Sequence, residues 1–138
     1  MTLPTELLRK LQVRSGSRLW LINVPQRLAE ELSAGAEVEI VHEKDPYDGV
    51  LAFFDSAAEV EALAGRILAE MPEDGLLWAA YRKGPAGRGA GLTRDVGWAP
   101  FDVAGWRPVR QIAIDPQWSA LRFRPQALVK AKAGSRFA

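Results

Sequence analysis

Three largely apolar runs of residues constrain the fold of this chain more than any other feature. They cover residues 18–24 (RLWLINV), 50–54 (VLAFF) and 76–81 (LLWAAY), and each has the length of a single β-strand. None of them alternates apolar with polar residues, which is the pattern of strands that are covered on both faces. Such strands are typical of parallel sheets packed between layers of helices. We therefore predict an α/β protein.

Helix signals lie between and before these runs. We expect short helices at residues 4–11 and 25–35 and a longer one at residues 56–71. Ser56 and Glu59 match the S-x-x-E capping box, in which two side chains satisfy backbone N–H groups at a helix start. The apolar residues that follow recur every three or four positions and predict one buried face: Val60, Leu63, Ala64, Ile67, Leu68 and Met71.

A further helix is expected to begin at Thr93, whose side chain is a suitable N-cap, with Asp95 near the positive end of the helix dipole. Pro100 lies inside this segment and predicts a kink or a restart, and Gly105 would close it. The preceding residues 82–91 (RKGPAGRGAG) are predicted to form a glycine-rich loop that carries three cations.

Three more strands complete the predicted sheet. Residues 37–41 alternate polar with apolar side chains, which favours a strand near the sheet edge, and residues 109–114 and 119–123 form an antiparallel hairpin. We predict a three-layer Rossmann-like sandwich with a mostly parallel six-stranded sheet in the order 2-1-3-4-6-5, whose one antiparallel strand comes from the C-terminal hairpin. Residues 1–125 would form this single domain, and residues 126–138 a basic, flexible tail.

The residue types present argue against several kinds of site. The chain has no cysteine, and its single histidine, His42, is expected at the surface beside Glu43. The sequence contains neither a G-x-S-x-G elbow nor clustered metal ligands, so no triad-type catalysis and no metal site are predicted. Asp45 and Asp48 flank a proline turn and are expected to shape it. Because neither a secretory signal nor a membrane-spanning run is recognised, we expect a cytoplasmic protein.

The net charge of +1 hides an uneven distribution along the chain. Residues 1–81 contain 7 Lys/Arg and 14 Asp/Glu, giving −7, and residues 82–138 contain 11 Lys/Arg and 3 Asp/Glu, giving +8. Such a split can mark an anion-binding face. The charges can also neutralise one another when the halves interleave in one sheet or when subunits pair head to tail, and we favour these explanations.

Candidate ligand-binding residues are expected beyond the carboxyl ends of the parallel strands, where open α/β sheets hold their ligands. Lys83, Arg88 and Arg94, with backbone amides of the glycine-rich loop, could form an anion site. The spacing GPAGRGAG matches neither common nucleotide-binding motif, and the alternative is a solvated loop. The predicted ligand-binding residues are Tyr81, Lys83, Arg94, Asp95 and Trp98.

Other residues are expected around the same rim. Asp115 and Trp118 belong to the hairpin turn and could instead lie at the opposite end of the sheet. The further rim candidates are Asn23, Asp55, Arg82 and Thr93.

Two stretches resemble class I S-adenosylmethionine-dependent methyltransferases. Residues 47–51 (YDGVL) resemble that family's FDxVL strand, and residues 71–77 (MPEDGLL) resemble its LKPGGxL turn and strand. The resemblance implies a Rossmann-like core. That family places a glycine-rich cofactor loop after its first strand, whereas this chain has residues 21–25 (LINVP) there and no glycine between Gly16 and Gly35. Because glycine lets the backbone approach a nucleoside closely, we expect no cofactor.

Over nearly its whole length the chain also resembles a group of small bacterial proteins that form a domain-of-unknown-function family. Residues 92–98 (LTRDVGW) and 108–125 (PVRQIAIDPQWSALRFRP) carry this resemblance. It implies a bacterial cytoplasmic protein with the domain limits given above.

Because nucleophile, metal and nucleotide motifs are missing, we expect a non-catalytic module that acts through self-association or a protein partner. The alternative is a binding protein or enzyme for a small anionic ligand or nucleotide at the carboxyl ends of the strands. Nucleic acid is a less favoured partner, because packing explains Trp98 and Trp118 better than base stacking does. No membrane partner is expected.

Overall fold

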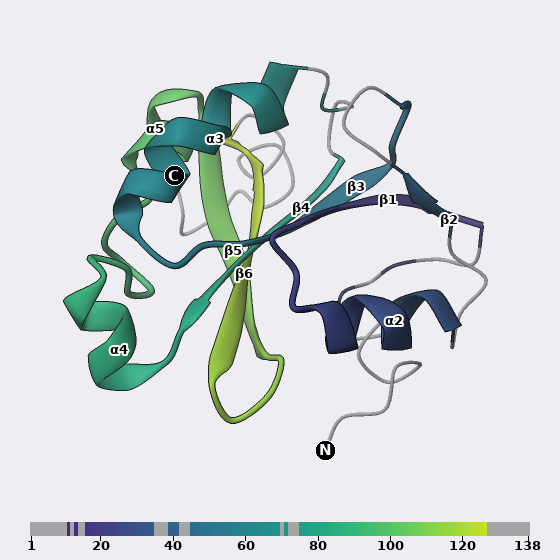
Figure 1. Ribbon diagram of the computed structural model, residues 1–138. Coiled ribbons are helices and arrows are strands. Elements are labelled where there is room, and N and C mark those ends of the chain that lie inside the picture. The colour runs from purple at the N-terminus through teal and green to yellow at the C-terminus, as the bar shows by residue number, and fades with distance from the viewer. Residues whose placement is uncertain are drawn as a thin grey trace.

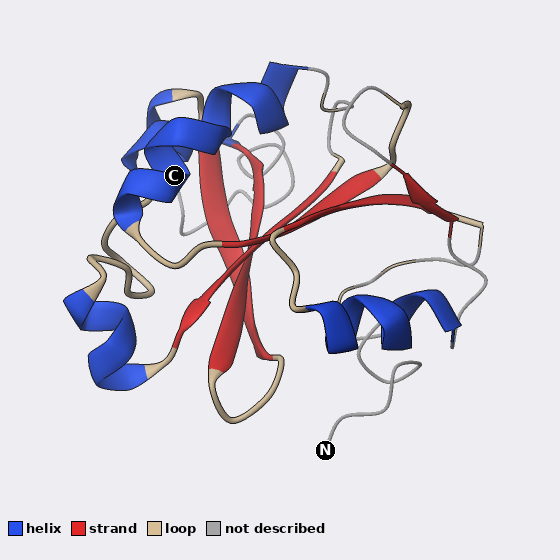
Figure 2. Ribbon diagram, in the orientation of Figure 1, coloured by secondary structure: helices blue, strands red, loops and turns tan. Residues whose placement is uncertain are grey.

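The computed structural model describes residues 11, 13, 16–34, 39–41, 45–69, 71 and 75–126. Within these residues, six strands form one sheet with helices on both of its faces (Figures 1 and 2). The strands are β1 (Arg18–Ile22), β2 (Glu39–Val41), β3 (Gly49–Phe53), β4 (Leu76–Arg82), β5 (Trp106–Ala113) and β6 (Trp118–Pro125). The helices are α2 (Gln26–Ala34), α3 (Ala57–Ala69), α4 (Gly84–Gly89) and α5 (Ala99–Val103).

The strand order is β2-β1-β3-β4-β6-β5, which confirms the predicted order. β1 pairs in parallel with β2 and β3, and β3 pairs in parallel with β4. β6 runs antiparallel to both β4 and β5, so it is the antiparallel strand expected from the hairpin. All five residues of β3 are buried, as its unbroken apolar run predicted for a central strand.

Two apolar layers hold the helices against the sheet. Val60 and Ile67 of α3 and Phe101 of α5 pack on one face. Leu32 of α2 packs on the other face, in a cluster that includes Phe53. Figure 1 shows α3 and α5 on one side of the sheet and α2 on the other. The described residues therefore form the predicted three-layer sandwich.

Two buried aromatic side chains in these layers bond through their polar groups to the backbone. Trp78 is fully buried, as predicted, and its indole N–H donates to the carbonyl oxygen of Leu11 at 2.8 Å. The hydroxyl of Tyr47 donates to the carbonyl oxygen of Ile67 in α3, also at 2.8 Å. Each bond avoids the cost of an unpaired polar group in the core. Together they tie the segments before β1 and β3 to the sandwich.

The start of α3 confirms the predicted capping box. The hydroxyl oxygen of Ser56 accepts a hydrogen bond from the amide of Glu59 at 3.3 Å. The carboxylate of Glu59 accepts in return from the amide of Asp55 at 2.6 Å, one residue earlier than in the usual pattern. The predicted stripe then buries Val60, Ala64 and Ile67 against the sheet.

The predicted helix start at Thr93 is wrong. Residues 93–98 form a turn in which the Thr93 hydroxyl accepts from the amide of Asp95 at 3.3 Å, and α5 begins only at Ala99. Gly97 has φ +100°, a left-handed conformation that cannot continue a right-handed helix. The Thr93 side chain therefore caps a turn rather than a helix.

Pro100 and Gly105 act at the two ends of α5. Pro100 lies in the first turn of α5, where its missing N–H leaves no hydrogen bond unmade, so it starts the helix rather than kinking it. Gly105 follows the helix at φ +90° and closes the segment as predicted.

The cationic stretch 82–91 also differs from the predicted loop, because it contains the short helix α4. Pro85 lies in the first turn of this helix. A side chain at Gly87 would overlap the backbone carbonyl oxygens of Arg82 and Leu92. Glycine at this position therefore lets α4 lie directly on the end of β4.

The β5–β6 turn lies at the carboxyl end of β4. Arg82 pairs with Trp118 across the β4–β6 ladder, and the amide of Lys83 donates to the carbonyl oxygen of Gln117 at 2.9 Å. The expectation that Asp115 and Trp118 could lie at the opposite end is wrong, because an antiparallel β6 begins where β4 ends. The carboxylate of Asp115 shapes the turn by accepting from the amides of Gln117 (2.7 Å) and Trp118 (2.9 Å).

Some predictions fall outside the described residues. These are the helix at 4–11, the surface position of His42 and Glu43, and residues 127–138 of the basic tail. The limits of the domain therefore stay a prediction. None of the described helices combines the length and apolarity needed to cross a lipid bilayer.

Candidate ligand-binding site

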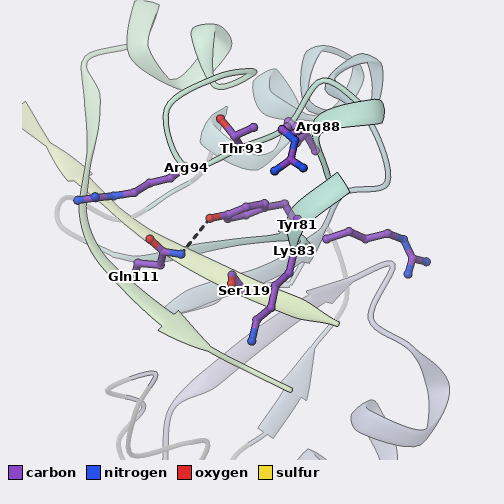
Figure 3. A pocket seen from close by; sticks show the side chains of 10 residues that line it. Tyr81, Lys83, Arg88, Thr93, Arg94, Gln111 and Ser119 are labelled. Atoms are coloured by element: carbon purple, nitrogen blue, oxygen red, sulfur yellow. Dashed lines mark hydrogen bonds between the residues drawn. The ribbon is translucent and has the colours of Figure 1, made fainter. Parts of the chain in front are cut away.

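A pocket of about 410 Å³ opens at the carboxyl end of β4 (Figure 3). Its walls come from the end of β4 with α4, from the turn that precedes α5, and from facing positions of β5 and β6. This rim is where open α/β sheets hold their ligands. The lining residues are Tyr81, Arg82, Lys83, Gly84, Arg88, Leu92, Thr93, Arg94, Gln111 and Ser119.

Besides Arg82, three cationic side chains line this pocket. Lys83 follows β4, Arg88 belongs to α4, and Arg94 comes from the turn before α5. Among the described residues none of the three makes an ion pair, and none of those lining the pocket is an acid. In Figure 3 the three side chains extend in different directions from the pocket wall. The pocket therefore presents positive charge to an incoming molecule.

Arg82 is held differently from the other three cations. Its Nε donates to the Asp55 carboxylate at 3.3 Å, and its guanidinium lies 4.4 Å from the centroid of the Trp118 ring. The Trp118 ring in turn packs on Phe53, with 4.7 Å between the ring centroids. These contacts direct the guanidinium of Arg82 toward Asp55 and Trp118 while the side chain stays partly exposed, so Arg82 helps to build the wall.

The ring of Tyr81 lies in the middle of the residues drawn in Figure 3, and its hydroxyl accepts a hydrogen bond from Gln111 Nε2 at 3.1 Å. Burial raises the pKa of the Tyr81 phenol above its ordinary value, against the opposing effects of hydrogen bonding with Ser119 and of the charge on Arg94. Tyr81 therefore keeps its proton at neutral pH. It is a neutral hydrogen-bonding group rather than a base.

Trp98 packs against Tyr81 and Thr93, two residues that line the pocket. Its ring meets the Tyr81 ring edge-on at 5.7 Å between centroids, and its indole N–H donates to the carbonyl oxygen of Thr93 at 2.7 Å. Only 6% of Trp98 is exposed, which confirms that packing explains this indole better than stacking on a base. Through Thr93, Trp98 fixes the turn from which Arg94 extends.

A second pocket of about 480 Å³ adjoins the first, and Arg94 lines both. It lies between the turn, α5 and the start of β5, with Phe123 of β6 contributing to its floor. Most of its lining side chains are apolar or aromatic. They are Arg94, Asp95, Val96, Gly97, Trp98, Ala99, Asp102, Trp106, Pro108 and Phe123.

The structure thus divides the predicted site residues between two neighbouring pockets. Tyr81, Lys83 and Arg94 line the first, whereas Asp95 and Trp98 line the second. Of the further rim candidates, Arg82 and Thr93 also line the first pocket. Asn23 and Asp55 line neither, and Asp55 reaches the region only through its bond to Arg82.

Sequence reasoning missed two polar residues of the first pocket, Gln111 and Ser119. Ser119 lies directly opposite Tyr81 in the β4–β6 ladder, and Gln111 of β5 donates to the hydroxyl of Tyr81. Only the strand register brings them to the pocket. They could have been identified only by predicting which residue of β6 pairs with which residue of β4, because neither residue belongs to a local motif.

The end of β1 is shaped by Asn23, Val24 and Pro25. Asn23 turns the chain there at φ +54°, a left-handed conformation that asparagine tolerates better than most residues with a side chain. The next residue, Val24, packs into the core layer beneath α2. Pro25 follows and has no N–H to offer, and its carbonyl oxygen accepts from Ala29 in the first turn of α2.

No group of three or more His, Cys, Asp or Glu side chains that could hold a metal ion occurs in the described ranges.

Comparison with known proteins identifies the fold. No protein-family model and no curated protein matches the chain. A solved S-adenosylmethionine-dependent methyltransferase from Aquifex aeolicus superposes with a TM-score of 0.61 at 12% identity, over 87% of this chain and 88% of that one. The N-methyltransferase NodS from Bradyrhizobium japonicum gives a TM-score of 0.53 at 12% identity, over 88% and 93%.

An O-methyltransferase family 2 protein from Planctomyces limnophilus, solved in complex with apigenin, gives a TM-score of 0.57 at 14% identity, over 86% of this chain and 45% of that one. Identities this low establish a shared fold and nothing further. The chain therefore has the Rossmann-like fold of these methyltransferases, as the resemblance in its strands implied. The resemblance to a domain-of-unknown-function family stays a prediction.

The end of β1 does not fit S-adenosylmethionine, the cofactor for which the Aquifex aeolicus methyltransferase is named. Where that family's loop uses glycines, this chain has Asn23, Val24 and Pro25. A β-branched side chain packed into the core and a proline without an N–H replace the close, hydrogen-bonding backbone that a nucleoside needs. We therefore assign no chemistry through S-adenosylmethionine to this site.

Proposed function

We propose that this protein binds a small anionic molecule in the pocket at the carboxyl end of β4. The observation that carries the proposal is the set of three cations, Lys83, Arg88 and Arg94, around a pocket with no acid among its described lining residues. Charges of one sign in a concave site cost free energy unless an oppositely charged ligand joins them. A phosphate or carboxylate group supplies that charge.

The size and polar groups of the pocket support a ligand of metabolite size. Its volume of about 410 Å³ lies within the range of small-molecule sites. The hydroxyls of Thr93 and Ser119 and the amide of Gln111 add uncharged hydrogen-bonding groups near the cations. Arginine and lysine together suit phosphate well, because arginine donates in a planar fork and lysine acts as a compact charge.

The geometry supports binding better than catalysis. The described lining residues include no histidine and no carboxylate, and Tyr81 keeps its proton at neutral pH. A general base for proton transfer is therefore missing from this set.

An interaction module, by comparison, has little support from the described surface. The large apolar side chains exposed there are Val96 and Val103, and an extended apolar patch is what a self-association site needs.

Isothermal titration calorimetry tests the proposal. The probes are inorganic phosphate, glucose 6-phosphate and citrate, with glucose as the neutral counterpart. We expect at least one of the anions to bind and glucose not to bind. Lys83→Ala and Arg88→Ala should each weaken binding about tenfold, because hydrogen bonds to charged groups contribute roughly 1.5–3 kcal/mol.

Arg110→Ala is the matched control. Arg110 is an exposed cation of β5 that lines neither pocket, so its loss changes the net charge equally and should leave the affinity within about twofold. Equal losses in all three variants would mean that the probes respond to overall charge. That result, or the absence of binding by any anion, would refute the site.

A further inference from the structure

We infer that the ligand is an amphipathic anion, with its anionic group in the first pocket and a neutral aromatic or branched apolar group in the second. This inference rests on the proposed function and adds the chemical class of the ligand. It follows from the adjacency of two pockets that have different linings and share one cation.

The second pocket has the lining of an apolar subsite. Trp106 and Pro108 of β5 and Ala99 of α5 form its walls, and the buried rings of Trp98 and Phe123 form its floor. The rings of Trp98 and Phe123 lie 5.6 Å apart between centroids. Trp106 is partly exposed beside this buried pair. A flat apolar group placed here would be removed from water against aromatic surfaces.

The two pockets are joined through specific residues. Arg94 lines both, and the wall behind them is the edge-on contact of Tyr81 in the first pocket with Trp98 in the second. Figure 3 shows the Arg94 side chain extending away from Tyr81, past Gln111. One molecule with its anionic group beside Lys83 can therefore extend past Arg94 into the aromatic pocket.

The charges of the second pocket set the orientation of the ligand. Asp102 is paired with Arg107, whose Nη1 lies 2.7 Å from its carboxylate. Asp95 is exposed at the same pocket and carries a negative charge. Because Arg94 also lines this pocket and balances Asp95, the lining offers no net positive charge to a second anionic group, whereas a neutral ring needs none. The anionic group is thus directed to the pocket of Lys83 and Arg88.

Calorimetry with matched probes tests this inference. Inorganic phosphate is compared with phenyl phosphate, acetate with phenylacetate, and benzyl alcohol serves as the ring without the charge. The ring-bearing anion of at least one pair should bind about tenfold tighter than its ring-free counterpart, because the ring loses apolar surface to the pocket. Benzyl alcohol should bind more weakly than the ring-bearing anions.

Two variants then locate the ring. Trp106→Ala should remove most of the tenfold gain and leave the affinity for the ring-free anion unchanged. Because Trp106 also packs against the core, Ala99→Gln is the second variant. Ala99 is exposed at the start of α5, so a longer, neutral side chain there can enter the pocket while the fold is retained. It should reduce the gain in the same way.

The outcomes separate the two proposals. Equal affinity within both probe pairs overturns the amphipathic ligand and leaves the anion site standing. A gain that neither variant reduces also overturns it, because the ring then binds elsewhere. If no anion binds at all, the proposed function itself fails.

Discussion

Asp48 joins two strands of the sheet through a single side chain. Its Oδ2 accepts from the backbone amide of Arg18 at 2.8 Å, and its Oδ1 accepts from Nη2 of the same arginine at 3.1 Å. The amide of Asp48 also donates to the Arg18 carbonyl oxygen at 2.8 Å. The carboxylate expected to shape a turn thus also connects the start of β1 to the segment that leads into β3.

This contact makes stability depend on pH in a defined direction. Hydrogen bonding from the Arg18 side chain lowers the pKa of Asp48 below its ordinary value. A lowered pKa in the folded state contributes stability above the unfolded pKa, and that stability is lost as the pH falls through the folded pKa. Because both side chains are nearly half exposed, solvent screens the pair and keeps the contribution small.

We therefore expect Asp48→Asn to lower the free energy of unfolding by about 0.5–1 kcal/mol at pH 7, the upper part of the range for exposed pairs. The difference from the unsubstituted protein should shrink below about pH 4, where the carboxyl is protonated in the unfolded chain. Urea denaturation at pH 7 and at pH 3 measures both values. Glu61→Gln, an exposed change on α3, is the control. A difference of equal size at the two pH values would contradict this account.

At the scale of elements, α4 depends on one glycine. A Cβ at Gly87 would overlap the carbonyl oxygens of Arg82 and Leu92. Both are backbone atoms, so they cannot move away by a change of rotamer. Gly87→Ala should therefore lift α4 from the end of β4, with a loss of about 2 kcal/mol, typical of overpacking. Since α4 carries Arg88, the same change should weaken anion binding.

Gly89 provides the matched control within the same helix. It is exposed, and a Cβ there would have no heavy atom within 4 Å. Gly89→Ala should stabilise the protein slightly, because alanine loses less conformational freedom in a helix. Thermal denaturation of both variants, together with their affinity for the bound anion, measures the contrast. Equal effects of the two substitutions would show that α4 does not rest on the close contact at Gly87.

The same elements show what the sequence could and could not predict. The central strands were predictable because residues covered on both faces must be apolar throughout, and β3 is such a run. The helix start at Thr93 was not, because Gly97 adopts φ +100° at a place where Leu92 and Gly91 leave no room for a Cβ, and this close approach is visible only in the folded chain. Ser119 and Gln111 reach the pocket through strand register alone, which no short motif encodes.

At the scale of the whole molecule, the fold of methyltransferases is present, but the cationic pocket lies at the end of β4 rather than at the end of β1. In the order β2-β1-β3-β4-β6-β5, the strands β6 and β5 of the basic second half of the chain form one edge of the sheet beside β4, and α4 follows β4. Part of the uneven charge along the chain is therefore gathered in space at Lys83, Arg88 and Arg94. This arrangement separates the candidate ligand site from the position of that family's glycine-rich loop.

This separation predicts how the protein responds to S-adenosylmethionine. Because Asn23, Val24 and Pro25 do not form a glycine loop, S-adenosylmethionine should not raise the Tm. It is added at 1 mM, about 1,000 times a micromolar Kd, where a bound ligand would stabilise the protein by about 4 kcal/mol. A bound anion should raise the Tm by mass action. If S-adenosylmethionine does raise the Tm, the double variant Lys83→Ala with Arg94→Ala shows which site binds it. If S-adenosylmethionine stabilised the protein and this variant abolished the effect, the cationic pocket would be holding its carboxylate. If the effect persisted, the end of β1 would bind the nucleoside despite its lack of glycine.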